Sequence, residues 1–465
     1  MTEGNYIAYA MIFLWPIITI WLYKTKPIQV ATLWTIVGGY MFLPVRTSVE
    51  LPMIPSLGKD SIPIISALLG IIIVKSKRIS IIRELGRIKY LVVLFLIVPL
   101  MTSALNSDVI ITGGRFIPGL TYYDGLSFVI NQLLLIMPFF IGRQLFKTYD
   151  DQLTVFKLLV VYGLLYSFLM LFEVRMSPQL HTWIYGYFPH SFAQQIRFGG
   201  FRPVVFMGHG LLVSFFAAVV LLAATALWKN RVKIRQFSPA TVTYYLMVVL
   251  VLCKSIASLF YGLFAFLVIF FINFRTQHRI AILLVCVTML YPVMSIMKVL
   301  PHQTVVNVAT SISEDRAASL QFRFDNEEKL LIHARERLLF GWGGWGRNRV
   351  FNEETGIDET VTDGRWIITF GQFGVLGFIA EFGLLSITVF RAKKASLLLK
   401  SKPEKTLLAA HALLIGIIML DQLPNSSLAP WLWLLAGILL GRSEAIINQY
   451  KRANVNGEVK VDLLK

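Results

Sequence analysis

The sequence has few charged residues for its length. Only 15% of its 465 residues are charged, and 26 acidic residues stand against 44 lysines and arginines. A soluble protein of this size carries about a quarter charged residues. The shortage therefore excludes a soluble multidomain protein, and the low acidic content leaves a formal charge of +18.

Cysteines and the common cofactor motifs are scarce as well. Cys253 and Cys286 both lie in apolar stretches, so the sequence predicts no disulfide framework. No His-x-x-x-His, Cys-x-x-Cys or Asp-x-Asp pattern marks a metal site, and no P-loop or dinucleotide motif occurs. We therefore expect neither a metal ion nor another cofactor.

Hydrophobic residues make up 56% of the chain and are gathered in long blocks. Each block is close to the length of about 20 residues that a helix needs to cross a bilayer. The sequence thus predicts an all-α polytopic membrane protein with about 12 to 13 transmembrane helices. The expected helices lie near residues 6–23, 28–45, 61–75, 90–105, 125–142, 153–172, 208–228, 240–253, 256–273, 280–298, 365–390, 406–422 and 428–440.

The basic residues indicate how the chain is oriented. They are concentrated in short loops between apolar blocks, at 75–89, 229–235 and 391–405. Such loops are typical of the cytoplasmic side of an inner membrane. We therefore expect the N-terminus outside and the C-terminus inside, and the bilayer explains the positive charge better than a nucleic acid does.

The same assignment of helices and loops predicts one membrane domain, residues 1–445, followed by a polar, mobile cytoplasmic tail, 446–465. Two longer segments, 173–207 and 299–364, would lie in the periplasm. The polar periodicity of the second segment predicts a helix near 316–338, with a glycine-rich turn after it.

Arginines gather in these two outer segments. Arg197 and Arg202 flank a Gly-Gly pair, and Arg316 and Arg323 lie in the predicted loop helix. An ion pair, a lipid headgroup or a solvated face explains any single one of them. Several together favour a bound anion, because the planar guanidinium matches phosphate oxygens two at a time.

The second half of the chain, from Arg197 to about residue 385, resembles the superfamily of O-antigen ligases and O-antigen polymerases. Those ligases carry an Arg-x-x-x-Leu element in their long loop, which residues 316–320 match. They also carry a His-containing pair, nine residues and then Gly-x-x-Gly; here Asp363-Gly364 precedes the motif at 374–377 by the same spacing. Asp363 thus replaces the catalytic histidine of the ligases, and the turn CKSIASL lacks their usual Ser-Arg pair.

The resemblance implies a membrane glycosyltransferase that works without a metal. Its donor would be a glycan on undecaprenyl diphosphate, with the diphosphate held by Arg197, Arg202, Arg316 and Arg323. Asp363 would be the base that deprotonates the acceptor hydroxyl, although an aspartate at this position could equally cap the helix that follows. The possible supporting residues are His209, Lys254, Glu328, His333 and Arg365.

Purely structural roles could also explain the supporting residues. His209 precedes a predicted helix, where a capping or packing role is expected. His333 is expected on a half-exposed helix face, and Glu328, with Asp325 and Glu327, on a solvated one.

Several functions fit this reading. The replacement of histidine by aspartate favours a polymerase that joins lipid-linked repeat units into an exopolysaccharide or O-antigen, with a chain-length regulator as a partner protein. A ligase would instead transfer the glycan to lipid A-core or to a protein. A transporter or flippase of amphipathic substrates, or a non-catalytic assembly partner, belongs to another class. Visible repeats, which many transporters have, are not found.

Overall fold

The computed structural model describes residues 4–51, 54–80, 85–299, 301–311 and 314–455. In this part of the chain the protein is an all-α polytopic membrane protein, as the sequence predicts. Nine helices are long and apolar enough to cross a bilayer, and four shorter apolar segments lie among them. All of these segments fall on the predicted apolar blocks.

The membrane helices have the following bounds. The long ones are α1 (Tyr6–Thr25), α4 (Ile88–Leu105), α5 (Tyr122–Leu145), α6 (Tyr149–Met176), α8 (Gly210–Lys229), α11 (Phe274–Ile296), α14 (Arg365–Leu398), α15 (Lys402–Asp421) and α16 (Pro430–Val455). The shorter ones are α2 (Ile28–Phe42), α3 (Ile62–Leu69) continued by the π-helix η1 (Gly70–Val74), α9 (Pro239–Leu252) and α10 (Ile256–Phe271).

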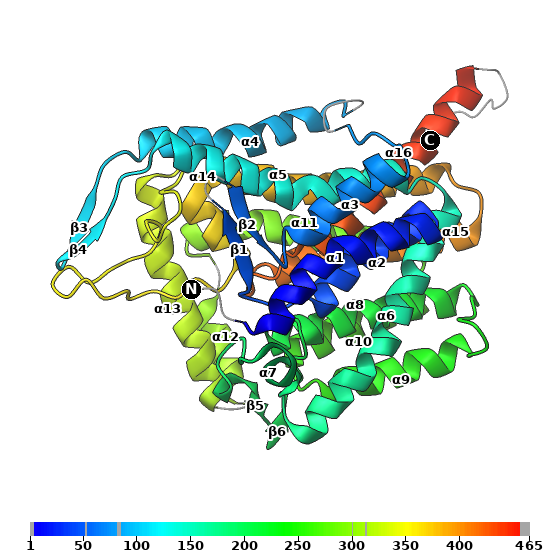
Figure 1. Cartoon of the computed structure of the whole chain (residues 1–465), viewed down its shortest axis with the longest axis horizontal. Coiled ribbons are helices and arrows are strands. Elements are labelled where there is room, and N and C mark those ends of the chain that lie inside the picture. The colour runs from blue at the N-terminus through cyan, green and yellow to red at the C-terminus, as the bar shows by residue number, and fades with distance from the viewer. Residues whose placement is uncertain (1–3, 52–53, 81–84, 300, 312–313, 456–465) are drawn as a thin grey trace.

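The connections between these helices gather at two ends of the bundle (Figure 1). One end, called the α13 end below, carries the short helices α7 (Leu180–Tyr185) and η2 (Ala193–Gln195) and the loop helices α12 (His302–Thr310) and α13 (Glu314–Glu336). It also carries three antiparallel hairpins. These are β1–β2 (Ser48–Leu51 and Ile54–Gly58), β3–β4 (Ile110–Thr112 and Arg115–Ile117) and β5–β6 (Ile196–Arg197 and Gly200–Phe201).

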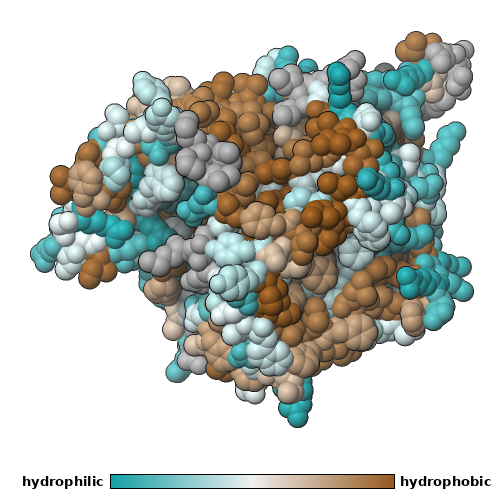
Figure 2. Space-filling view, viewed as in Figure 1, coloured by the Kyte–Doolittle hydropathy of each residue, from teal (hydrophilic) through white to brown (hydrophobic). Residues whose placement is uncertain are grey.

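Helix α8 forms the centre of the bundle. Every residue from Val213 to Leu227 is buried, and its small Ala, Ser and Thr side chains let neighbouring helices approach closely. Helices at the flank instead expose large apolar side chains, such as Phe13, Phe271 and Leu283. Figure 2 shows apolar side chains over much of the visible flank, as expected for a surface that faces lipid.

Helix α14 is broken at Gly374, the first glycine of the Gly-x-x-Gly motif. Its φ of 64° and ψ of −168° are non-helical. The backbone after α13 fits into this break: the Val375 amide donates to the Leu338 carbonyl at 2.8 Å, and the Trp342 amide donates to the Gly371 carbonyl at 2.8 Å. The motif therefore couples the loop helix α13 to a membrane span.

We expect Gly374→Ala to lower the midpoint of thermal unfolding of the purified protein in detergent. The φ and ψ of Gly374 belong to a region that costs other residues about 1–3 kcal/mol. A Cβ there would also meet the backbone of Leu339 and Phe340. Gly383→Ala is the matched control in the same helix, because its added Cβ meets only the Leu91 side chain, at 3.3 Å. Equal midpoints for the two variants would contradict this account.

The structure also refines the predicted boundaries. The turn between α9 and α10 lies at Lys254 and Ser255 as predicted, and α13 nearly coincides with the predicted loop helix. Helix α16, however, continues to Val455, so the first ten residues of the predicted mobile tail are helical. No glycine or proline interrupts residues 442–456, which explains why the helix does not stop at the membrane boundary.

Candidate functional site

The β5–β6 hairpin holds two of the predicted arginines at the α13 end. Arg197 ends β5 and is exposed, and Arg202 follows β6 directly. The hairpin turns through Phe198 and Gly199, both with positive φ. The chain on the two sides of the hairpin is joined by the Arg202 amide, which donates to the Gln195 carbonyl at 2.8 Å.

Arg202 is a buried cation whose hydrogen-bonding capacity is only partly used. Its side chain is 7% exposed, and Nη2 donates to the Lys254 carbonyl at 3.3 Å. Its Nε has no hydrogen-bond partner among the described residues. Burial, together with the nearby charge of Arg197, lowers the pKa of Arg202 to about 10. A buried guanidinium with an unused donor is a natural ligand for an anion.

Arg323 reaches the same place from α13. Its Nη1 donates to the Pro424 carbonyl at 3.1 Å, and its Nε lies 3.5 Å from Oδ2 of Asp363. Its positive charge acts on His209, as do the charges of Arg197 and Arg202. Arginines more than a hundred positions apart in the sequence thus all act on His209, and Arg197, Arg202 and Arg323 are called the arginine cluster below.

His209, on which these three charges act, caps helix α8. Its Nδ1 accepts a hydrogen bond from the Leu211 amide at 3.0 Å, while Nε2 faces Oε1 of Gln194 at 3.4 Å. Burial, with the charges of His190 and the arginine cluster, lowers the pKa of His209 to about 4. The neutral ring therefore uses its lone pair for the cap, as the capping interpretation predicts, and cannot serve as a base in this state.

A cavity of about 590 Å³ lies between α3 and α5, and none of the three arginines is among its described lining residues. Met207 and Leu212, on either side of His209, line it. Its charged lining residues are Arg46, Lys59, Asp60 and Arg365. Asn131, Leu134 and Leu135 of α5 also line it. These α5 residues lie between nine and thirteen positions after the start of the helix, so the cavity follows α5 for about 6 Å.

Buried contacts fix two of the charged residues of this cavity. Nζ of Lys59 donates to the carbonyls of Leu43 at 3.0 Å and Phe206 at 2.5 Å, and burial lowers the pKa of Lys59 to about 7. Arg365 donates from Nε and Nη2 to Oε1 of the buried Glu381, at 2.9 and 2.7 Å. Lys59 thus ties together the loops around the cavity, and Arg365 is held at its wall.

Asp363 lines a smaller pocket of about 240 Å³ together with Arg323 and Glu327. The N-cap of α14 is Gly364 and has no side-chain cap. Asp363 therefore does not cap α14, and the capping interpretation is wrong: the helix starts one residue too late for this side chain to reach its free amides. The carboxylate, 40% exposed, instead faces Arg323.

Glu327 is the second carboxyl group of this pocket. The hydroxyls of Tyr291 and Ser295 donate to it at 3.1 and 2.9 Å. Burial raises the pKa of Glu327 to about 7. The expectation of a solvated helix face therefore fails for Glu327, because α13 packs this side chain against α11.

The turn between α15 and α16 fixes the start of α14. Asp421 accepts hydrogen bonds from Nδ2 of Asn425 at 2.8 Å and from Oγ of Ser427 at 2.6 Å. The Asn425 carbonyl in turn accepts from the Arg365 amide at 3.0 Å. This turn also supplies the Pro424 carbonyl to Arg323, so it positions both Arg323 and Arg365.

The structure separates some of the other predicted residues from the cluster. Glu328 forms an exposed ion pair with Lys298 at 2.6 Å. His333 stacks on Trp342 with a centroid distance of 4.2 Å and bonds the Arg347 carbonyl at 2.9 Å, so it stabilises the loop while its side chain stays partly exposed, as predicted. Lys254 adjoins the cluster through its carbonyl, whereas the side chain of Arg316 lies outside the described residues.

Sequence reasoning missed Arg46, Lys59, Asp60, Glu327 and the turn at 421–427. Lys59 and Arg46 did carry a signal, because basic residues in a short outer connection run against the orientation rule. Nothing in the local pattern indicates that Glu327 is buried.

The described residues hold no group of three or more His, Cys, Asp or Glu side chains placed to bind a metal ion. What the site offers chemically is a group of cations, two carboxyl groups and a cavity lined by both charged and apolar side chains. Among known proteins no family and no curated protein matches this chain.

Proposed function

We propose that this protein transfers a glycan from undecaprenyl diphosphate to an acceptor hydroxyl, and that it thereby polymerises lipid-linked repeat units into a surface polysaccharide. The observation that carries the proposal is the buried, partly unpaired guanidinium of Arg202 beside Arg197 and Arg323. Together they form a site for a diphosphate near the cavity between α3 and α5.

The cavity between α3 and α5 supports a lipid-linked donor. Arg365 and Arg46 contribute charge to its lining, while Leu134, Leu135 and Ile64 contribute apolar side chains. A polyprenyl diphosphate has the same division between a charged head and a long apolar chain. A soluble nucleotide sugar would leave the part of the cavity along α5 unused.

The reaction is a displacement at the anomeric carbon. The acceptor oxygen bonds to that carbon as the bond between the carbon and the diphosphate oxygen breaks. The arginine cluster stabilises the negative charge that develops on the leaving diphosphate. Asp363, beside Arg323, takes the proton of the acceptor hydroxyl, as carboxylates do in inverting glycosidases.

The proposal requires the α13 end to face the periplasm, which is the orientation that the basic loops predict. Cysteines introduced at Asn307 or Glu354, both exposed, should react with a membrane-impermeant thiol reagent in intact spheroplasts. Lys233→Cys, in a connection at the opposite end, should react only after lysis. The background is low because Cys253 is buried and Cys286 partly so. The reverse pattern would place the arginine cluster in the cytoplasm and exclude this function.

Reconstitution tests the activity directly. Purified protein in proteoliposomes, supplied with undecaprenyl-diphosphate-linked repeat units and a chelator, should release undecaprenyl diphosphate and yield a ladder of glycan lengths. Glycan attached to added lipid A-core, without a ladder, would identify a ligase. Movement of the lipid-linked unit across the bilayer without any new glycosidic bond would show that the protein is a transporter and not a glycosyltransferase.

A further inference from the structure

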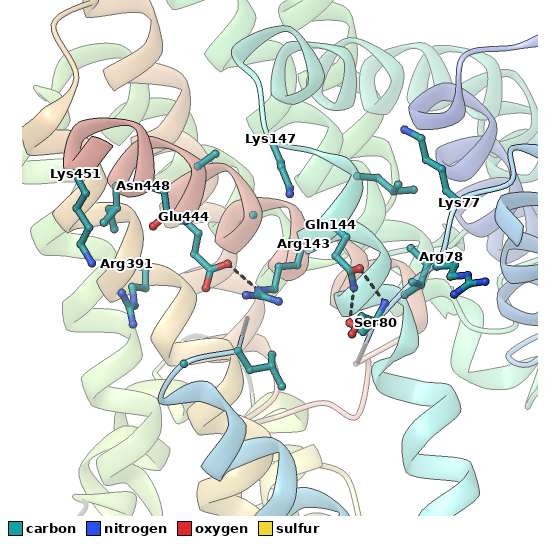
Figure 3. Close-up of a pocket in the computed structure, with 17 residues that line it drawn as sticks. Lys77, Arg78, Ser80, Arg143, Gln144, Lys147, Arg391, Glu444, Asn448 and Lys451 are labelled. Carbon is teal, nitrogen blue, oxygen red and sulfur yellow. Dashed lines mark hydrogen bonds and ion pairs between the residues drawn. The ribbon is translucent and has the colours of Figure 1, made fainter. Parts of the chain in front are cut away.

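A second large cavity lies at the end of the bundle opposite α13. Its volume is about 1250 Å³, more than twice that of the cavity between α3 and α5, which measures about 590 Å³. Four parts of the chain line it: residues 77–80 with Leu85 and Gly86, the end of α5 with Lys147, α14 at Arg391, and α16 from Gly441 to Lys451 (Figure 3).

The lining of this cavity is strongly basic. Its cations are Lys77, Arg78, Arg143, Lys147, Arg391 and Lys451. Glu444 is the only carboxylate among its described lining residues, so six cations against one anion leave a surplus of five positive charges. Glu444 pairs with Nε of Arg143 at 2.7 Å, and the charges of Arg391 and Lys147 also act on it. Basic side chains thus predominate among the described residues that line this cavity.

Specific hydrogen bonds hold the two sides of this cavity in place. Nε2 of Gln144 donates to the Ser80 carbonyl at 2.7 Å, and Oε1 of Gln144 accepts from the Ser80 amide at 3.0 Å. This pairing fixes the segment that carries Lys77 and Arg78 against α5, as Figure 3 shows. Arg143 is itself only 6% exposed. The backbone around Ser80 and the side chain of Arg143 are therefore fixed beside the cavity, while Lys77, Arg78, Lys147 and Lys451 line it with exposed side chains.

Basic residues at this end are expected from the orientation rule, and most such residues lie on solvated loops. Here they come from separate elements and face one cavity that is large enough for a polar headgroup. Like charges repel one another, and a multivalent anion would relieve the repulsion. Basic pockets between membrane helices bind phosphate-rich lipid headgroups in this way.

We propose that the basic cavity at the opposite end binds an anion with two phosphate groups. This chemistry is shared by a lipid with two phosphodiesters, such as cardiolipin, and by a soluble diphosphate. The proposal does not depend on the glycosyl transfer proposed for the α13 end.

The test titrates the purified full-length protein in neutral detergent with cardiolipin, with phosphatidylcholine as the blank, and separately with inorganic pyrophosphate. Binding is followed by native mass spectrometry and by the thermal unfolding midpoint. The double variant Arg78→Gln/Lys451→Gln removes two exposed lining cations, and Lys233→Gln/Lys394→Gln removes two exposed lysines that lie outside the cavity lining. The Arg78→Gln/Lys451→Gln variant loses two contacts between a cation and a phosphate, so it should bind the anion about 30-fold more weakly.

The titrations with cardiolipin and with pyrophosphate identify the source of the phosphates. Binding of cardiolipin alone, weakened only in the lining variant, supports a lipid headgroup site. Binding of pyrophosphate, with the same variant dependence, supports a soluble ligand. If neither probe binds more tightly than the blank, or if both double variants bind as the unmodified protein does, the proposal is wrong.

Discussion

Asp363→Asn should reduce glycan transfer by a factor on the order of 10² to 10⁴, the usual contribution of a general base. The amide has nearly the same size as the carboxylate but cannot accept the acceptor's proton at neutral pH. Folding should be preserved, because the side chain makes no cap and its ion pair with Arg323 is partly exposed, which makes such a pair worth little. Release of undecaprenyl diphosphate by purified, monodisperse protein measures the effect.

Asp325→Asn is the matched control for this variant. Asp325 is an exposed carboxylate on α13, two residues from Arg323, and its contact is with the Gln321 side chain at 2.6 Å. It should retain normal transfer. Near-normal transfer by Asp363→Asn itself would remove Asp363 from the mechanism and leave Glu327 as the other carboxyl group of the pocket.

The pH profile distinguishes these two carboxyl groups. A base must be ionised, and burial raises the pKa of Glu327 to about 7. If Glu327 took the proton, transfer would increase as pH rises through about 7, and Glu327→Gln would abolish both the activity and this increase. With Asp363 as the base, Glu327→Gln retains most of the transfer.

Arg323→Lys should lower transfer by a factor on the order of 10² to 10³, comparable to the loss of one fixed donor to a developing negative charge. Lysine keeps the charge but not the planar fork that lets Arg323 bond the Pro424 carbonyl while facing Asp363. The loss should appear in the maximal rate, because the diphosphate becomes most negative as it leaves.

Arg335→Lys tests whether any conservative change on α13 has this effect. Arg335 is exposed three turns further along the helix and lines a different pocket, of about 260 Å³. It should leave transfer unchanged. Full activity of Arg323→Lys would show that Arg323 acts as a simple charge or not at all, and the shared diphosphate site would lose one of its three members.

The sequence predicts the membrane helices well because a span is a property of one continuous segment. Even the short helices α9 and α10 are recognisable, since Lys254 and Ser255 interrupt a long apolar stretch. Helix α13 is equally local, because its polar periodicity does not depend on what it packs against.

The site itself depends on contacts between distant segments, and this limits what the sequence can predict. Arg202 and Arg323 are visible as outer arginines, but their convergence on His209 requires the packing of α8, α13 and the β5–β6 hairpin. The cap formed by His209 was foreseeable from its place before an apolar block. The burial of Glu327 was not, because it is decided by Tyr291 and Ser295 on another helix.

The turn at 421–427 is synthesised after the site residues that it positions, so the site can be completed only late in translation. A ribosome that has completed α14 has already synthesised Arg197, Arg202, Arg323 and Asp363. It has not yet supplied the Pro424 carbonyl that holds Arg323, nor the Asn425 carbonyl that holds the start of α14. A chain released early would therefore carry the reactive side chains without the contacts that align them. If the protein is the glycosyltransferase we propose, such incomplete copies would be inactive and would not consume the lipid-linked donor.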